Sequence, residues 1–331
     1  MIWKVASLYI AAVIGAGFAS GQEIIQFFQR FGRAGLIGLI LATLALSILG
    51  GLILKKCYEL KTSDYKALLF KVSGTEAAFL DLLYTTFLLA GLAIMLAGSK
   101  ETIYILFGIP GGQYITALAV VYLLVRGPEK ILNASALLIP FLIGYILFIG
   151  RTMLVRNGLR IPQESINFGI PYSLLYPGFN LGFALAIFAS IADLLPNKKT
   201  AFYGGIVGGL VLGGLIGLML LTLWSGPAIA LSSPVPMLFI AERISKSTGL
   251  VYGIVLWIAM YTTAVANGLA VATRLKPIVD LSWTTISIIV VFLACLVSRA
   301  GFVLLISFAY PLFGFVGIYL IYRLLRYDGK T

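Results

Sequence analysis

The sequence predicts an all-α membrane protein with ten transmembrane helices in a five-plus-five inverted repeat. Three observations carry this prediction. The 331 residues are 60% hydrophobic and 11% charged, with a mean hydropathy of +1.04, far outside the range of a soluble domain. The chain contains ten apolar runs, most of them near the length of about 20 residues that crosses a bilayer. A glycine motif in the first run recurs in the sixth. We expect residues 1–331 to form one integral membrane domain.

The ten runs divide evenly about the middle of the chain. The first five are 3–28, 34–54, 77–107, 114–125 and 131–149. The second five are 172–195, 203–224, 250–272, 283–297 and 302–325. The segment 234–246 is too short and too charged to span, so we expect an amphipathic helix lying on the surface.

The distribution of basic residues predicts the orientation of the chain. Ten spans place both termini on one side, and 15 of the 24 basic residues lie on that side. By the positive-inside rule, both termini are expected in the cytoplasm. The first 30 residues lack a signal-peptide pattern, so the first helix is expected to remain in the mature protein. Two cysteines and no histidine argue against a disulfide framework and a transition-metal site.

The first run combines glycines with polar side chains, which close packing alone does not explain. Gly15 and Gly17 would let a neighbouring helix approach. Ser20, Gln22 and Glu23 follow directly, and polar groups within a span usually face a cavity. We therefore predict an interrupted helix at 15–17, with free backbone amides at the start of its second half. The positive end of a helix suits a carboxylate.

The recurrence of this motif in the second half of the chain predicts the inverted repeat. Residues 17–21 and 178–182 share the pattern Gly-Phe-x-x-Gly, and Pro177 precedes the second copy. We expect residues 175–182 to interrupt the sixth helix, since proline breaks helices. The repeats would span 1–151 and 168–327. Paired interrupted helices mark the binding site of a transporter.

These residues carry a resemblance to a known family. The break at Gly15 to Phe18 resembles the Gly-x-Gly interruption of amino acid, polyamine and organocation transporters with the LeuT-type fold. The longer string from Gly15 to Ile24 resembles the bacterial YkvI-like membrane proteins. The resemblance implies a secondary active transporter, not an enzyme, in the bacterial cytoplasmic (inner) membrane. Its partners would be the bilayer and a small zwitterionic solute, an amino acid or related amine, with no nucleic acid and no cofactor beyond a coupling ion.

The two expected breaks and the third helix predict the substrate site. Aromatic side chains flank both breaks and are expected to cover a bound solute, while the third helix lines the pocket in this fold. The expected substrate-binding residues are Gly15, Ala16, Gly17, Phe18, Phe87, Gly91, Tyr176, Gly178, Phe179 and Asn180.

The eighth run carries a candidate ion site. Ala259, Thr262 and Thr263 follow the spacing i, i+3, i+4, which places them on one helical face. The resemblance implies one sodium ion held by these three residues and by the carbonyls of Ala11 and Ile14. The alternative is that both threonines bond back to their own helix.

Glu23 leaves two interpretations open, proton coupling or an ion pair with Arg30 or Arg33. Two rival functions also stay open. One is a proton-coupled or uncoupled carrier of the same fold. The other is a membrane receptor subunit that senses a ligand without moving it.

Overall fold

A computed structural model describes residues 1–61, 65–126, 129–166 and 168–327, with the backbone alone for 129–137. The described chain is almost entirely α-helical. Its α-helices are α1 (Ile2–Val13), α2 (Ala16–Ser20), α3 (Gln22–Phe27), α4 (Arg33–Leu60), α5 (Tyr65–Ser73), α6 (Ala77–Phe107), α7 (Gly112–Arg126), α8 (Glu129–Asn157), α9 (Gly169–Ser173), α10 (Leu175–Ser190), α11 (Lys198–Ser225), α12 (Pro236–Ile244), α13 (Lys246–Leu275), α14 (Trp283–Ser298) and α15 (Phe302–Arg326).

The lengths and composition of these helices make the protein a multi-pass membrane protein. Within the described residues, seven helical segments are long and apolar enough to cross a bilayer: α4, α5 with α6, α8, α9 with α10, α11, α13 and α15. Three shorter apolar helices, α1, α7 and α14, accompany them. Each predicted apolar run overlaps one of these segments. Hydropathy predicts them well because a lipid-exposed backbone must satisfy its hydrogen bonds within a helix.

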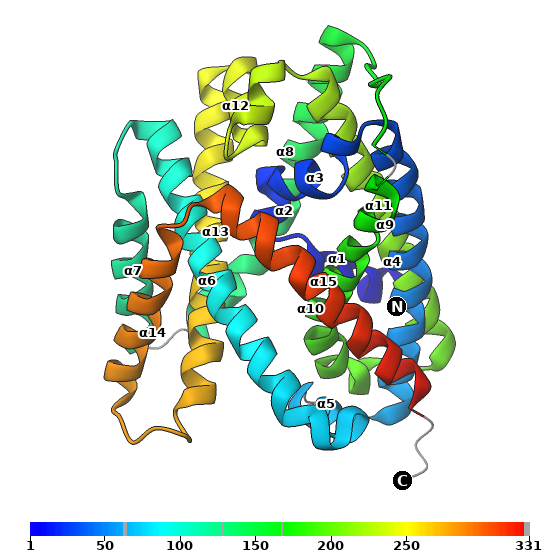
Figure 1. Cartoon of the computed structure of the whole chain (residues 1–331), viewed down its shortest axis with the longest axis vertical. Coiled ribbons are helices and arrows are strands. Elements are labelled where there is room, and N and C mark those ends of the chain that lie inside the picture. Colours follow the sequence, from blue (N-terminus) through cyan, green and yellow to red (C-terminus); the bar gives the residue numbers. More distant parts are fainter. Residues whose placement is uncertain (62–64, 127–128, 167, 328–331) are drawn as a thin grey trace.

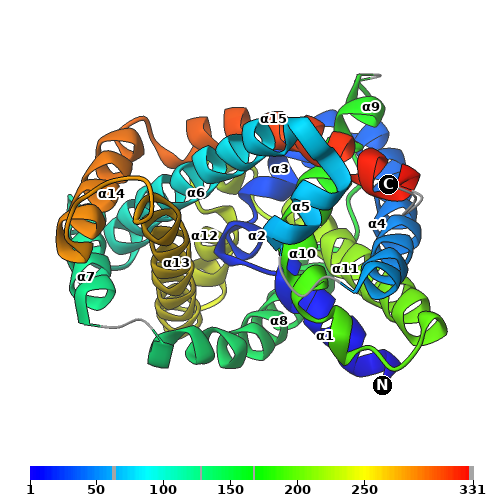
Figure 2. The ribbon, with the colours of Figure 1, turned by 90° about the horizontal axis from the view of Figure 1, so that it is seen from below.

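The helices pack as a bundle around a short central segment. Figures 1 and 2 show α4 and α11 side by side at one edge and α7 and α14 at the other, with α15 crossing the front. The short helix α2 lies in the interior, where it contacts α13 and α12. The amphipathic helix expected at 234–246 is α12, which covers one end of the bundle, and α5 lies at the opposite end.

Glycines determine how closely α11 approaches α4. Gly205 and Gly209 lie one helical turn apart and face α4. A Cβ atom on Gly205 would collide with the Gly51 backbone, and one on Gly209 would collide with the Ser47 backbone. Small residues at this spacing bring two membrane helices into backbone contact.

The predicted interruption of the first helix is present. Helix α1 ends at Val13, and the backbone is extended at Ile14 (φ −74°, ψ 96°) and Gly15 (φ −115°, ψ −175°) before α2 begins. A second bend follows at Gly21, whose φ of 84° is left-handed and favours glycine. The side chain of Met237 on α12 packs over Gly21 and leaves no room for a Cβ atom.

The predicted interruption of the sixth helix at 175–182 is wrong. Helix α10 runs without a break through these residues, and the only discontinuity in the segment is Leu174, between α9 and α10. Pro177 is the third residue of α10, where a helix has no N–H to pair within itself, so proline is tolerated there. The side-chain amide of Asn180 donates to the Tyr176 carbonyl over 3.0 Å, one turn earlier.

Candidate functional site

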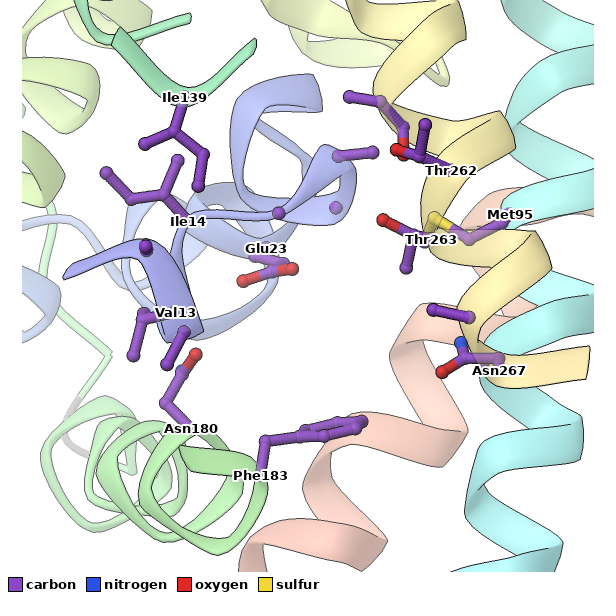
Figure 3. Close-up of a pocket in the computed structure, with 18 of the residues that line it drawn as sticks. Val13, Ile14, Glu23, Met95, Ile139, Asn180, Phe183, Thr262, Thr263 and Asn267 are labelled. Atoms are coloured by element: carbon purple, nitrogen blue, oxygen red, sulfur yellow. The ribbon is translucent and has the colours of Figure 1, made fainter. Parts of the chain in front are cut away.

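A cavity of about 350 Å³ lies at the interruption of the first helix. Its walls come from α1, α2, α3, α6, α8, α10, α13 and α15, and it is mainly apolar with a few polar side chains. This size and lining are typical of a small-molecule site. Figure 3 shows Val13 and Ile14 on one wall, Thr262 and Thr263 on the opposite wall, and Glu23 between them.

The first wall is the interrupted backbone itself. Ala11, Ile14, Gly15, Ala16 and Gly17 all line the cavity. Because α1 ends at Val13, its last carbonyl groups have no helical N–H partner one turn further on. The interruption thus places carbonyl oxygens that lack an intrahelical partner beside the cavity.

The opposite wall is one face of α13. Ala259, Thr262, Thr263 and Asn267 line the cavity at helical spacing. The Thr262 hydroxyl donates to the Ala259 carbonyl over 3.1 Å, which is the back-bonded arrangement that we gave as the alternative for the threonines. For Thr263, Figure 3 shows the hydroxyl pointing into the cavity. The two threonines therefore differ in what they offer a ligand.

Glu23, on α3, is the acidic side chain of the described cavity wall. It is 4% exposed, and its Oε2 atom accepts a hydrogen bond from the Tyr176 hydroxyl over 3.3 Å. No basic side chain of the described residues forms an ion pair with it. An ionised carboxylate that is buried without a partner is costly, so a proton or a bound cation must compensate its charge.

The arginines that we weighed as partners of Glu23 lie elsewhere. Arg30 donates to Gln26 Oε1 over 3.1 Å and lies over the ring of Tyr172. Arg33 donates to Gln163. Of the two interpretations of Glu23, the ion pair with an arginine is therefore wrong.

An aromatic cluster closes one side of the cavity. Phe179 stacks on Tyr310, with ring centroids 4.1 Å apart and planes 22° from parallel. Phe183 packs against Phe179 at 5.4 Å and against Phe87 at 4.0 Å. Helices α10, α15 and α6 thus meet through their aromatic side chains beside the polar part of the cavity.

The structure separates the ten predicted substrate residues into two groups. Those that line the cavity are Gly15, Ala16, Gly17, Gly91, Phe179 and Asn180. Those that do not are Phe18, Phe87, Tyr176 and Gly178. Phe18 and Tyr176 are fully buried, and a Cβ atom on Gly178 would collide with α15, so this glycine serves helix packing. Phe87 packs against Phe183 and Tyr176 donates a hydrogen bond to Glu23, so both contact residues of the cavity wall.

Two polar residues of the cavity, Asn267 and Tyr310, were not predicted from the sequence. Asn267 lies one turn after Thr263, so extending the α13 pattern by four residues would have found it. Gly91 makes room for it, because a Cβ atom there would lie 2.6 Å from Asn267 Nδ2. Tyr310 carried no such signal, since its helix has no polar pattern at this level.

No protein family model matches the chain. It is homologous to the Bacillus subtilis (strain 168) membrane protein YkvI, with 24% identity over 97% of this chain and 94% of that protein. It is also 25% identical to the Bacillus subtilis protein YyaD, over 99% of this chain and 98% of that one. The first of these relatives bears the name of the family that the string from Gly15 to Ile24 resembles.

Solved structures with the same fold are LeuT-type transporters rather than enzymes. The inward-facing conformation of Mhp1 matches 98% of this chain and 75% of Mhp1, with a TM-score of 0.65 and 15% identity. Mhp1, a nucleobase-cation-symport-1 family transporter, also matches in a closed conformation with bromovinylhydantoin bound, over 89% and 70% of the two chains (TM-score 0.59, 16% identity). The Eremococcus coleocola manganese transporter matches 96% of this chain and 75% of its own (TM-score 0.52, 16% identity).

Proposed function

We propose that this protein is a secondary active transporter that moves a small zwitterionic solute, an amino acid or a related amine, together with one sodium ion. The observation that carries the proposal is the cavity between the interrupted first helix and the polar face of α13. Transporters of this fold bind their cargo where interrupted helices meet and expose it to each side in turn. The protein would work in the bacterial cytoplasmic membrane with both termini in the cytoplasm.

The same proposal includes the internal repeat. The ten apolar segments of the described chain form two groups of five, the first ending with α8 at Asn157 and the second within 168–327. The shared Gly-Phe-x-x-Gly pattern occurs in the first helix of each group. With an odd number of helices in each group, the second copy begins on the opposite side of the membrane. The two copies would then form an inverted repeat within a single domain.

The sodium ion would bind between the carbonyls of Ala11 and Ile14 and the residues Ala259, Thr262 and Thr263. Support comes from the fact that all five residues line one cavity. Figure 3 shows Ile14 on one side of it and Thr262 and Thr263 on the other. Carbonyl and hydroxyl oxygens suit a hard cation. The Thr262 hydroxyl would keep its bond to the Ala259 carbonyl and offer its lone pairs to the ion.

The solute would occupy the rest of the cavity. Gly15, Ala16 and Gly17 would contribute backbone groups, and Asn180 would contribute its amide. Phe179 would cover the solute, since it lines the cavity and is held by the neighbouring aromatic rings.

Proton coupling is a second candidate, and one observation favours it. Glu23 is buried at the cavity without an ion-pair partner among the described residues, as a carboxylate that binds and releases a proton would be. In that case transport would be independent of sodium and sensitive to Glu23→Gln.

A thermal-stability screen tests the proposal. The purified protein is melted with amino acids and amines in sodium chloride and, in parallel, in N-methylglucamine chloride. A ligand that binds only the folded state raises the melting temperature by mass action. The proposal predicts a solute whose stabilising effect requires sodium. A solute effect that is indifferent to sodium would favour proton coupling, and uptake into proteoliposomes would then distinguish a carrier from a receptor.

A further inference from the structure

We propose that Glu23 is the counter-ion of a positively charged nitrogen on the solute, so that the cavity selects molecules with a protonated amine. This inference rests on the proposed function and deepens it, because it names the chemical group of the cargo that a side chain recognises. It also assigns to Glu23 a role in binding the solute instead of a role in carrying protons.

The first step concerns charge. Glu23 is 4% exposed and lines the cavity, and among the described side chains of the cavity wall none is basic. The remaining polar side chains of that wall are amides, hydroxyls and the Tyr310 phenol. The described wall therefore offers one acidic group, which is negative when it has lost its proton, and no basic one. A solute with a positive group supplies the missing partner, whereas a solute with a net negative charge would meet uncompensated repulsion.

The second step concerns geometry, because the carboxylate has a hydrogen-bond partner on another helix and lies over a glycine. The Tyr176 hydroxyl on α10 donates to Oε2. The other oxygen, Oε1, lies over Gly17, where a Cβ atom would collide with it and would lie 2.8 Å from the Tyr310 hydroxyl. The absence of a side chain at Gly17 thus creates the space in which the carboxylate meets the cavity. A carboxylate fixed in this way is preorganised to bind a cation.

The third step concerns the kind of cation. Aromatic rings line the same cavity as the carboxylate, since Tyr310, Phe179 and Phe183 all contribute to its wall. Aromatic faces attract organic ammonium groups, and apolar walls accept the carbon skeleton that carries them. Among the described residues, no cluster of three or more His, Cys, Asp or Glu side chains forms a multi-carboxylate metal site. The surroundings of Glu23 fit an alkylammonium group better than a divalent metal ion.

The test compares matched solutes on the intact protein in detergent. Each probe is a primary amine or amino acid, paired with its N-acetyl derivative. Acetylation removes the positive charge of the nitrogen and keeps the carbon skeleton. Binding is measured by the shift in melting temperature and by calorimetry. We expect the free amine to bind at least about tenfold more tightly than the acetylated partner, as for a charge-assisted hydrogen bond. Equal binding of both partners, or binding only of neutral or anionic probes, would overturn the inference.

Variants then assign the preference to Glu23. Glu23→Gln should reduce the preference for the free amine to near unity, and Glu101→Gln serves as the control because Glu101 pairs with Lys100 away from the cavity. A Glu23→Gln variant that keeps the preference and loses only the pH dependence of uptake would show a proton carrier and overturn the inference. The comparison of matched solutes on the unchanged protein stands even if the variant fails to fold.

The failure of this inference can be told apart from the failure of the proposed function. Amine-selective binding without uptake into proteoliposomes would retain the role of Glu23 and reject transport. Uptake of a neutral or anionic solute that Glu23→Gln leaves unchanged would retain transport and reject the role of Glu23.

Discussion

The Tyr176 hydroxyl donates a hydrogen bond to Glu23 Oε2 over 3.3 Å, although 153 residues separate the two in sequence. The bond joins α10 to the short helix α3 beside the cavity. Both side chains are buried, and the rings of Phe27 and Phe28 pack edge-on against Tyr176. Tyr176 thus positions the carboxylate without lining the cavity itself.

Removing this hydroxyl should weaken solute binding more than it disturbs the fold. Tyr176→Phe keeps the ring and its packing but deletes the donor to Glu23, which costs about 1 kcal/mol for an ordinary hydrogen bond. We expect a loss of severalfold in affinity and a drop of a few degrees in melting temperature. Tyr203→Phe is the control, because that ring is 52% exposed. An unchanged affinity in Tyr176→Phe would mean that the hydrogen bond does not position the carboxylate.

Adding one methyl group at Gly17 should disrupt the cavity. The new Cβ atom would meet Glu23 Oε1 and the Tyr310 hydroxyl, so either the carboxylate or the first helix must move. We expect Gly17→Ala to reduce solute binding about tenfold or more, since overpacking forces side chains from their positions. Gly144→Ala, where a Cβ atom meets nothing within 4 Å, is the matched control. Calorimetric titration on both variants measures the effect, and normal binding by Gly17→Ala would contradict the described geometry.

Close contact between α4 and α11 predicts a stability effect far from the cavity. Gly209→Ala would push a methyl group into the backbone of Ser47, and such overpacking typically costs about 1–3 kcal/mol. Gly214→Ala lies on the same helix with open space around it and should leave the melting temperature unchanged or slightly higher. Melting curves in detergent compare the two. Equal stability of both variants would show that α11 does not need its glycines to approach α4.

The proposed ion site predicts the loss of sodium dependence without the loss of the fold. The double variant Thr262→Ala, Thr263→Ala removes both hydroxyls from the α13 face while its backbone stays helical. We expect solute binding that no longer responds to sodium. Thr86→Ala is the control, because Thr86 is exposed and bonds back to the Leu82 carbonyl. Sodium dependence that persists in the double variant would rule out this site.

The helices of this protein could be predicted from hydropathy because the membrane imposes one rule on every span. The third run was expected at 77–107, and helix α6 has these bounds. The interruption at Gly15 could be predicted as well, since glycines beside Ser20 and Glu23 fit no packed span. Helix α5 was not expected, because its apolar residues form only a short run within the lysine-rich stretch after α4.

The second interruption was misplaced for a physical reason. Pro177 breaks a helix only when the turn before it is already helical. Here α10 starts at Leu175, so proline falls in the first turn and fits. The sequence motif could not reveal where the helix begins. In the same way, Gly178 could not be distinguished as a packing residue until α15 was seen against it.

The side chains of the cavity were predictable where they follow one helix and not where several helices meet. Ala259 and Thr262 follow helical spacing and lie on one face of α13. The approach of Tyr310 to Phe179 depends on how α15 crosses α10, which no local pattern contains. One of the two interpretations of Glu23 gave it an arginine partner from the same part of the chain, but its hydrogen-bond partner is Tyr176 from the other half.

Uptake of a labelled solute into proteoliposomes tests the central claim most directly. The solute is the one that stabilises the purified protein best in sodium, and the vesicles carry an inward sodium gradient or none. The account predicts uptake above that of protein-free liposomes, driven by the gradient and insensitive to it in the Thr262→Ala, Thr263→Ala variant. A solute that binds the protein but never enters the vesicles under either condition would contradict it and identify a receptor with a transporter fold.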